Sequence, residues 1–166
     1  RSVDRGPSIN YQSIGSGGGI RQLLDRTVDF GASDAPMTDD QLAKSSVAVL
    51  HFPMVLGAVV LTQNIPGFSG ELKLTSSLVS EIFRGKITRW NDPKLLQLNP
   101  GLPAIDIVVA HRSDGSGTTA IFTDYLAKTS PEWKSEVGAG TAVSWPAGVG
   151  AKGNEGVTGL VKHTPG

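Results

Sequence analysis

Cysteine is absent from the 166 residues of this chain. Without cysteine the protein cannot form disulfide bonds or thiolate metal sites, and its redox compartment cannot be inferred. An excess of charge of one sign is also absent, because 15 Lys and Arg residues balance 15 Asp and Glu residues. A formal net charge of zero argues against binding to nucleic acid or to a membrane surface through bulk charge, so any anion site must be local.

Long apolar runs are missing as well. No segment approaches the roughly 20 apolar residues that a membrane-spanning helix needs. Residues 1–6 lack the apolar core of a signal peptide. We therefore expect no direct membrane span, and either a cytosolic chain or one whose signal has been removed.

Glycine, by contrast, is abundant, with 21 residues. Two glycine-rich turns, at residues 15–19 and 114–119, each run directly into a helical pattern. A turn of this kind exposes unpaired backbone N–H groups and the positive end of the helix dipole, which together favour an anion. In the first turn Ser16 would add a hydroxyl donor, and the alternative interpretation is a flexible loop.

The second turn carries more of the chemistry that an anion site needs. Arg112, at the end of a strand-like run, can bind an oxyanion through two parallel hydrogen bonds. Ser116 and Thr118 add hydroxyl groups beside the free N–H groups of the helix start. Asp114 would repel an anion, so we expect it to pair with Arg112 and hold the guanidinium in place. The alternative is a capped helix start with an exposed Arg–Asp pair.

Asp34 follows an apolar run, residues 28–33, at a position where strands of α/β folds present ligand contacts. A carboxylate suits an anion site if the anion carries a proton. Hydrogen phosphate has a P–OH group that can donate to a carboxylate, whereas sulfate has no proton and would leave Asp34 facing like charge. The alternative is an Asp that caps a turn before Pro36.

Motifs for other chemistries are weak or missing. Residues 148–153 match the dinucleotide fingerprint G-x-G-x-x-G, but Pro146 interrupts the preceding strand. The sequence contains neither a P-loop nor a G-x-S-x-G nucleophile elbow. His51, His111 and His163 are too dispersed for a metal-ligand pair. We therefore predict no cofactor, no metal site and no catalytic residue.

Strand and helix patterns alternate along the chain, which predicts an α/β protein. Helices are expected near residues 20–24, 39–44, 76–83, 93–98, 121–126, 132–134 and 157–161. Strands are expected at residues 9–14, 28–33, 105–109 and 143–145, and residues 47–62 are expected to form either one strand bent by Pro53 or two strands in sequence.

Seven stretches together resemble a known family, the substrate-binding proteins of the high-affinity phosphate ABC transporter. They are residues 10–19, 28–36, 52–53, 64–67, 81–93, 112–118 and 152–157, in family order. The resemblance implies a two-lobed α/β fold, similar to the type II periplasmic binding proteins, whose lobes close on phosphate. It implies phosphate contacts from Ser16 and Asp34 in the first lobe and from Arg112, Ser116, Gly117 and Thr118 in the second, with Asp114 orienting the arginine.

The resemblance also has consequences for organisation and role. Family members are about twice as long, so we expect residues 1–58 to be a partial first lobe, with apolar faces that lack partners, and residues 59–166 to be most of the second. A fragment is favoured over a short relative completed by dimerisation or over segments missing from the sequence.

The role implied is import of hydrogen phosphate through a membrane permease, in the periplasm or on the surface as a lipoprotein, without enzymatic activity. The alternatives are a phosphate-ester hydrolase, a binder of another tetrahedral oxyanion such as sulfate, or an interaction fragment that has lost its ligand.

Overall fold

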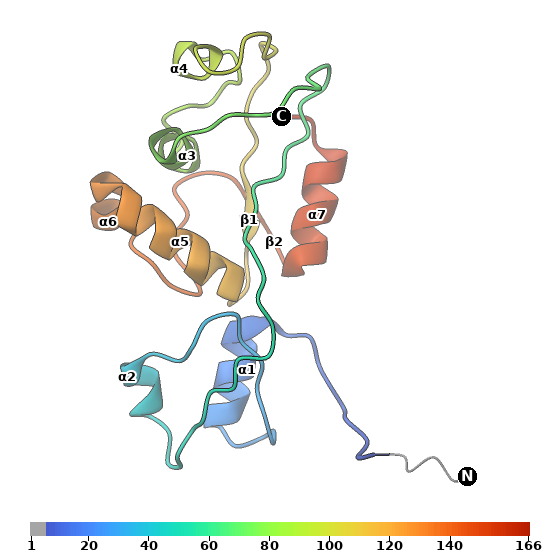
Figure 1. Cartoon of the computed structure of the whole chain (residues 1–166), viewed down its shortest axis with the longest axis vertical. Helices are drawn as coiled ribbons and strands as arrows, with labels where there is room; N and C mark the ends of the chain where they lie inside the picture. Colours follow the sequence, from blue (N-terminus) through green and yellow to red (C-terminus); the bar gives the residue numbers. More distant parts are fainter. Residues whose placement is uncertain (1–5) are drawn as a thin grey trace.

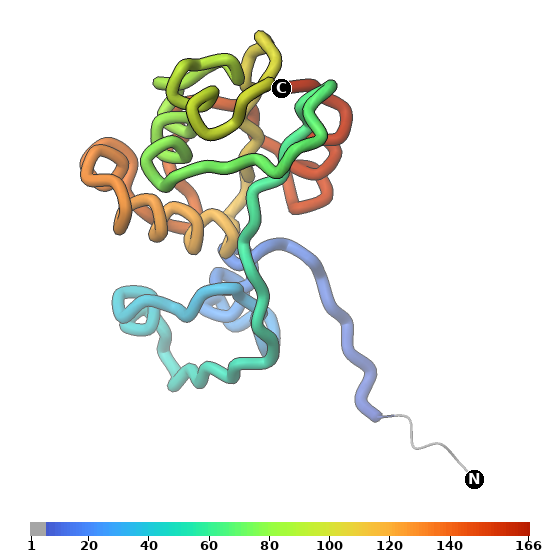
Figure 2. Tube along the Cα trace, turned by 45° about the horizontal axis from the view of Figure 1, so that its top comes forward, coloured from blue at the N-terminus to red at the C-terminus, as the bar shows by residue number. Residues whose placement is uncertain are grey.

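The computed structural model describes residues 6–166, so residues 1–5 of the predicted first lobe lie outside the described part. Two groups of elements are separated along the longest axis of the molecule (Figure 1). Helices α1 (Gly15–Leu24) and α2 (Asp39–Leu42) form the smaller group, and α3 to α7 with both strands form the larger one. The segment that follows α2 connects the two groups as an extended chain (Figure 2).

Of the two helices of the smaller group, α2 begins where the sequence predicts, whereas α1 begins five residues earlier than predicted, so that residues 15–19 form its opening turn. Gly15 opens α1 with φ +74°, a left-handed conformation that favours glycine. At α2 the Thr38 hydroxyl accepts from the Gln41 N–H, and the Gln41 carboxamide accepts from the Thr38 N–H. This reciprocal capping box is the one that the Thr-x-x-Gln spacing predicts.

The helices α3 (Ser76–Phe83) and α4 (Pro93–Leu96) begin at local capping signals. The Thr75 hydroxyl caps α3, and Asp92 caps α4 ahead of Pro93. α3 spans the predicted residues. α4 is shorter than predicted, because the Leu98 N–H turns back to the carbonyl of Leu95.

The remaining helices are α5 (Gly117–Thr129), α6 (Pro131–Glu136) and α7 (Gly153–His163). Ser116 caps α5 and Ser130 caps α6, each by accepting a backbone N–H. α7 begins earlier than predicted, inside a glycine-rich stretch that lacks a helical apolar pattern. No helix within residues 6–166 has the length and apolar character to cross a membrane.

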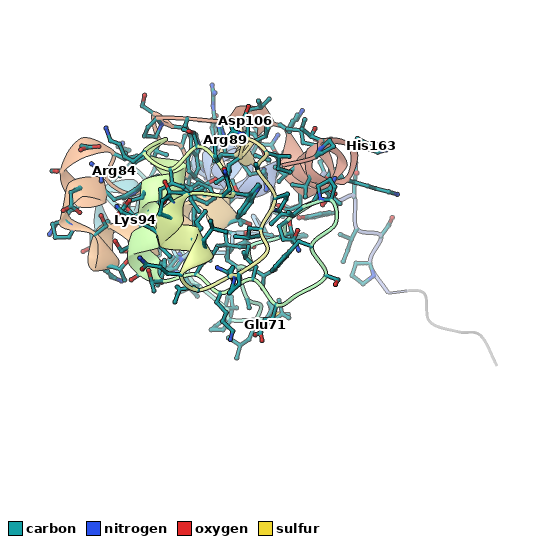
Figure 3. The ribbon with its side chains drawn as sticks, turned by 90° about the horizontal axis from the view of Figure 1, so that it is seen from above. Glu71, Arg84, Arg89, Lys94, Asp106 and His163 are labelled. Carbon is teal, nitrogen blue, oxygen red and sulfur yellow. The ribbon has the colours of Figure 1, made fainter. Side chains whose placement is uncertain are left out.

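The sheet consists of two short parallel strands, β1 (Ala110–Arg112) and β2 (Val149–Ala151), with Arg112 opposite Ala151. Several strand predictions are therefore wrong: within the described residues, 9–14, 28–33, 47–62 and 143–145 form no strand, and β2 was not predicted. Residues 105–109 lead into β1 and make only one isolated bridge, Arg89 with Asp106, whose side chains also lie side by side (Figure 3), with Nε and Oδ1 3.7 Å apart. The physical reason is that a strand requires a hydrogen-bonded neighbour, which an apolar run does not by itself supply.

The core belongs to the larger group of elements. One buried cluster joins α3 and α4 to the segments before β1, and a second joins α3 to α5 and α6 through Val79, Leu126 and Trp133. Aromatic rings extend the second cluster, because the Phe83 and Phe122 centroids lie 4.7 Å apart and Trp145 packs against both.

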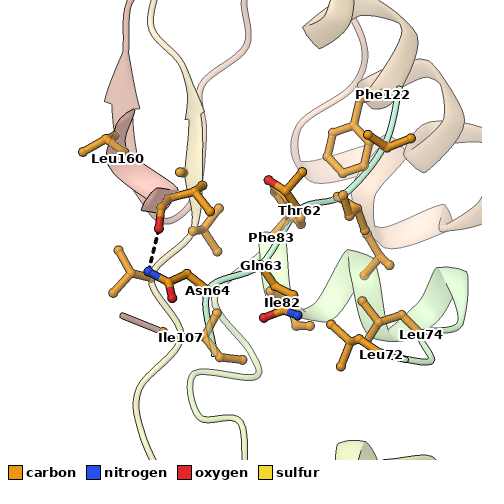
Figure 4. A pocket seen from close by; sticks show the side chains of 18 of the residues that line it. Thr62, Gln63, Asn64, Leu72, Leu74, Ile82, Phe83, Ile107, Phe122 and Leu160 are labelled. Carbon is orange, nitrogen blue, oxygen red and sulfur yellow. Dashed lines mark hydrogen bonds between the residues drawn. The ribbon is translucent and has the colours of Figure 1, made fainter. Parts of the chain in front are cut away.

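An apolar groove of about 790 Å³ runs between residues 59–64 and 107–110 (Figure 4). At one end Gly166 bridges these segments, since its N–H donates to the Asn64 carbonyl and its carbonyl accepts from the Val108 N–H. The Asn64 amide also donates to the Val161 carbonyl, at 2.8 Å (Figure 4).

The connecting chain is apolar but exposed. Phe52 is 73% exposed, Met54 88%, Val55 87% and Leu56 97%. This agrees with the expectation that apolar faces of the first lobe lack partners.

Candidate functional site

Arg112 is placed by the end of β1. Parallel pairing of β1 with β2 fixes the backbone at this point, and the second glycine-rich turn follows at once. The side chain of Arg112 is only 10% exposed, and that of Asp114 is 19% exposed. The fold therefore holds a cationic group in a largely buried position beside the start of a helix.

Asp114 accepts two parallel hydrogen bonds from this arginine, and the sequence predicts this pairing. Nε donates to Oδ1 at 2.6 Å and Nη2 donates to Oδ2 at 2.5 Å. The Gly153 N–H, in the first turn of α7, also donates to Oδ1, at 3.1 Å. Hydrogen bonding from Arg112, with a smaller contribution from Gly153, lowers the pKa of Asp114 to about 2. The same pair raises the pKa of Arg112, so both groups stay charged.

The start of α5 lies directly beyond this pair. The Ser116 hydroxyl is fully buried and accepts from the Thr119 N–H at 3.2 Å, while the Ser116 N–H donates to the carbonyl of Thr141. Gly117 and Thr118 occupy the first helical turn, whose N–H groups have no acceptor within the helix. The positive end of the α5 dipole therefore points toward the region of Arg112.

The two glycine-rich turns lie against each other. The Gly17 N–H donates to the Gly115 carbonyl at 3.0 Å. A Cβ atom added to Gly17 would stand 2.9 Å from the Cα of Gly115, which real contacts do not allow. The backbones approach this closely because neither residue has a side chain.

Ser16 and Asp34 reach the same point from the smaller group of elements. The Asp34 N–H donates to the Ser16 hydroxyl at 3.2 Å, and Ser16 is buried. A Cβ atom on Gly117 would lie 2.6 Å from Oδ2 of Asp34 and would also collide with the Ser16 hydroxyl. Residues that are far apart in the sequence thus meet at the start of α5.

Asn154 belongs to this cluster and was missed by the sequence analysis. Its side-chain carbonyl accepts from Nη1 of Arg112 at 2.7 Å. The only signal in the sequence was its place in the 152–157 stretch, which carried the family resemblance but no chemical argument.

His111, which precedes Arg112 on β1, has a different environment. Its ring stacks on Trp145 with centroids 4.7 Å apart, and its Nδ1 lies 3.0 Å from the Arg112 carbonyl oxygen. His111 and Trp145 line a hollow of about 320 Å³ beside the Arg112–Asp114 pair.

The comparison with known families identifies the fold. A model described as a PBP superfamily domain matches residues 4–166. The chain belongs to the PBP superfamily.

Curated relatives of this superfamily member carry the name "Phosphate-binding protein PstS". The protein from Xylella fastidiosa (strain Temecula1) is 51% identical over 164 residues, which cover 97% of this chain and 44% of the relative. The Haemophilus influenzae protein is 52% identical, with 96% of this chain and 48% of the relative covered. The Methanocaldococcus jannaschii protein is 43% identical, with 95% of this chain and 44% of the relative covered. The chain thus spans less than half the length of these relatives.

These findings confirm the family resemblance and the α/β class that the sequence predicts. The lobe boundary near residue 58 and the phosphate-contact roles stay predictions. In this chain, the structure brings Ser16, Asp34, Gly117 and the Arg112–Asp114 pair together at one junction.

Proposed function

We propose that this chain binds inorganic phosphate, as hydrogen phosphate, where the two glycine-rich turns meet. The observation that carries the proposal is the convergence of Ser16 and Asp34 with the Arg112–Asp114 pair and the start of α5. Arg112 would supply paired N–H donors, and Gly117 and Thr118 would supply backbone N–H groups. The Ser16, Ser116 and Thr118 hydroxyls would complete the set of donors.

Asp34 would accept a hydrogen bond from the protonated oxygen of the ligand. Its Oδ2 lies beside Gly117 at the start of α5, and its backbone N–H donates to the Ser16 hydroxyl. A P–OH group can donate to this carboxylate, whereas sulfate offers no donor and would meet like charge. The site would therefore select phosphate over sulfate.

The proposal includes two lobes, residues 1–58 and 59–166, with phosphate held between them. The packing of Gly17 on Gly115, and of Ser16 and Asp34 on Gly117, leaves no space for a side chain at the junction. Entry of phosphate would require these segments to move apart and then close on the ion.

We further propose that the parent protein delivers phosphate to the permease of an ABC transporter for import, from the periplasm or from a lipid-anchored position on the cell surface. The relatives' printed name supports phosphate binding. The transporter and the location follow from the family resemblance.

Binding without chemistry is the role we favour over phosphate-ester hydrolysis. A serine nucleophile needs an adjacent base. The Ser116 hydroxyl contacts the Thr119 N–H, while His51, His111 and His163 are engaged with Met37, Arg112 and Gly159 respectively. Steady turnover of a chromogenic phosphate ester, with or without divalent metal, would contradict this role.

Isothermal titration tests the proposed function directly. The purified chain, with its mass in solution known, is titrated at neutral pH with inorganic phosphate and separately with sulfate. Heat with phosphate and none with sulfate is the expected result. No heat with either ion would mean that this chain does not bind phosphate by itself, and equal heats would contradict the role of Asp34.

A further inference from the structure

Arg112 is held from two sides. Asp114 takes Nε and Nη2, and the carbonyl of Asn154 takes Nη1 at 2.7 Å. Asn154 lies in the first turn of α7, next to Gly153, whose N–H donates to Asp114. One turn of one helix therefore contacts both members of the ion pair.

These contacts leave a defined part of the guanidinium for other acceptors. A guanidinium has five N–H bonds. Three of them are engaged by Asp114 and Asn154, so one N–H remains on Nη1 and one on Nη2. Within residues 6–166 no other acceptor contacts them. These two N–H bonds, one on Nη1 and one on Nη2, can each donate to an oxygen of a tetrahedral oxyanion.

The charge of the side chain that holds Nη1 matters as much as its geometry. Asp114 already neutralises Arg112, and Glu155 and then Asp34 contribute further negative charge to its surroundings. An amide carbonyl can hold Nη1 without adding another negative charge, which a carboxylate in its place would do. Asparagine therefore fixes the guanidinium at a smaller electrostatic cost to anion binding than aspartate would.

We propose that Asn154 is a positioning residue of the phosphate site, which fixes Nη1 of Arg112 so that the free N–H pair keeps one orientation. This inference rests on the proposed function. The effect of Asn154 on the order of the Arg112 side chain can also be measured without phosphate.

Three variants separate this role from a structural one. Asn154→Ala removes the acceptor, Asn154→Asp keeps an acceptor oxygen but adds charge, and Thr158→Ala changes an exposed residue one turn further along α7 as the control. Each is titrated with inorganic phosphate, and the order of the Arg112 Nε–H bond is followed by nitrogen-15 relaxation.

We expect Asn154→Ala to lose about tenfold in phosphate affinity, as for one hydrogen bond to a charged group, and to lose order at Arg112. Asn154→Asp should keep Arg112 ordered and still bind phosphate at least about tenfold more weakly, because of its charge. Thr158→Ala should match the unchanged chain in both measurements. Affinity and order that stay unchanged in Asn154→Ala would overturn the inference.

The two proposals fail in different ways. If the unchanged chain binds phosphate but Asn154→Ala binds equally well, the positioning role is wrong and the proposed function stands. If the unchanged chain gives no heat with phosphate, the proposed function fails for this chain, and the relaxation measurement alone decides whether Asn154 orders Arg112.

Discussion

The ion pair between Arg112 and Asp114 shows how single residues set the electrostatics of the junction. The two residues are only two positions apart in the sequence, so their pairing costs little chain entropy. The carboxylate fixes the guanidinium but also cancels its charge. The remaining attraction for an anion must therefore come from directed N–H bonds and from the start of α5.

The low pKa of Asp114 links stability to acid pH. Its pKa in the folded chain is about 2, against an ordinary value of 3.8. A lowered pKa stabilises the folded state above about pH 4, and this contribution of about 2 kcal/mol is lost as the pH falls toward about 2. Urea unfolding between these pH values should show this decrease in the free energy of unfolding of the unchanged chain. In Asp114→Asn the decrease should be smaller by the contribution of Asp114. Equal losses in both chains would contradict the assignment.

Asp34 should control selectivity between anions. We expect Asp34→Asn to narrow the ratio of phosphate to sulfate affinity, because an amide can donate to an unprotonated oxygen where the carboxylate repels it. Titration of both chains with both anions measures the ratio. An unchanged ratio of phosphate to sulfate affinity would show that Asp34 does not distinguish the protonated anion from the unprotonated one.

Among the elements, five of the seven helices within residues 6–166 begin at a side-chain cap, which proline follows in α4 and α6, whereas α1 and α7 have no such cap. Thr38, Thr75, Asp92, Ser116 and Ser130 each accept a backbone N–H at a helix start. These signals lie within four residues of the groups that they satisfy, so the sequence reveals them.

Two of these caps provide a matched test. Ser116→Ala at α5 and Thr75→Ala at α3 each remove a hydroxyl that accepts a backbone N–H at 3.2 Å. Both should lower the free energy of unfolding by about 1 kcal/mol. Only Ser116→Ala should also weaken phosphate binding, because only α5 starts at the junction. Equal phosphate affinity in the two variants would remove Ser116 from the site.

For the whole molecule, the contact between the two groups of elements depends on the absence of side chains. Gly117→Ala should push Ser16 and Asp34 away, since the new Cβ atom would collide with both. We expect faster hydrogen exchange at the Gly17 N–H and at least about tenfold weaker phosphate binding.

Gly159→Ala is the control for this substitution. Gly159 is also helical, but a Cβ atom there meets no atom within 4 Å. This variant should gain about 0.5–1 kcal/mol of stability from helix propensity and keep both the exchange rate and the affinity. Unchanged exchange at Gly17 in Gly117→Ala would contradict the close contact.

The exposed connecting chain should contribute little to stability by itself. Leu56 is 97% exposed, whereas Leu95 is completely buried in the main core cluster. In urea unfolding, Leu56→Ala should change the free energy by less than about 0.5 kcal/mol, and Leu95→Ala should cost about 2–5 kcal/mol. A large loss in Leu56→Ala would show that this segment is packed in solution.

The sequence by itself determined the α/β class, the family and most helix starts, together with the pairing of Arg112 with Asp114. All of these rest on residues close together in the chain or on a pattern of short motifs. Only the tertiary structure decided which apolar runs become strands, because a strand needs a distant partner for its hydrogen bonds. It also decided that Ser16 and Asp34 meet Gly117, and that Asn154 reaches Arg112 across 42 positions of the sequence. No local rule encodes such contacts, since they depend on how β2 and α7 pack beside β1 and on how closely two glycine turns approach.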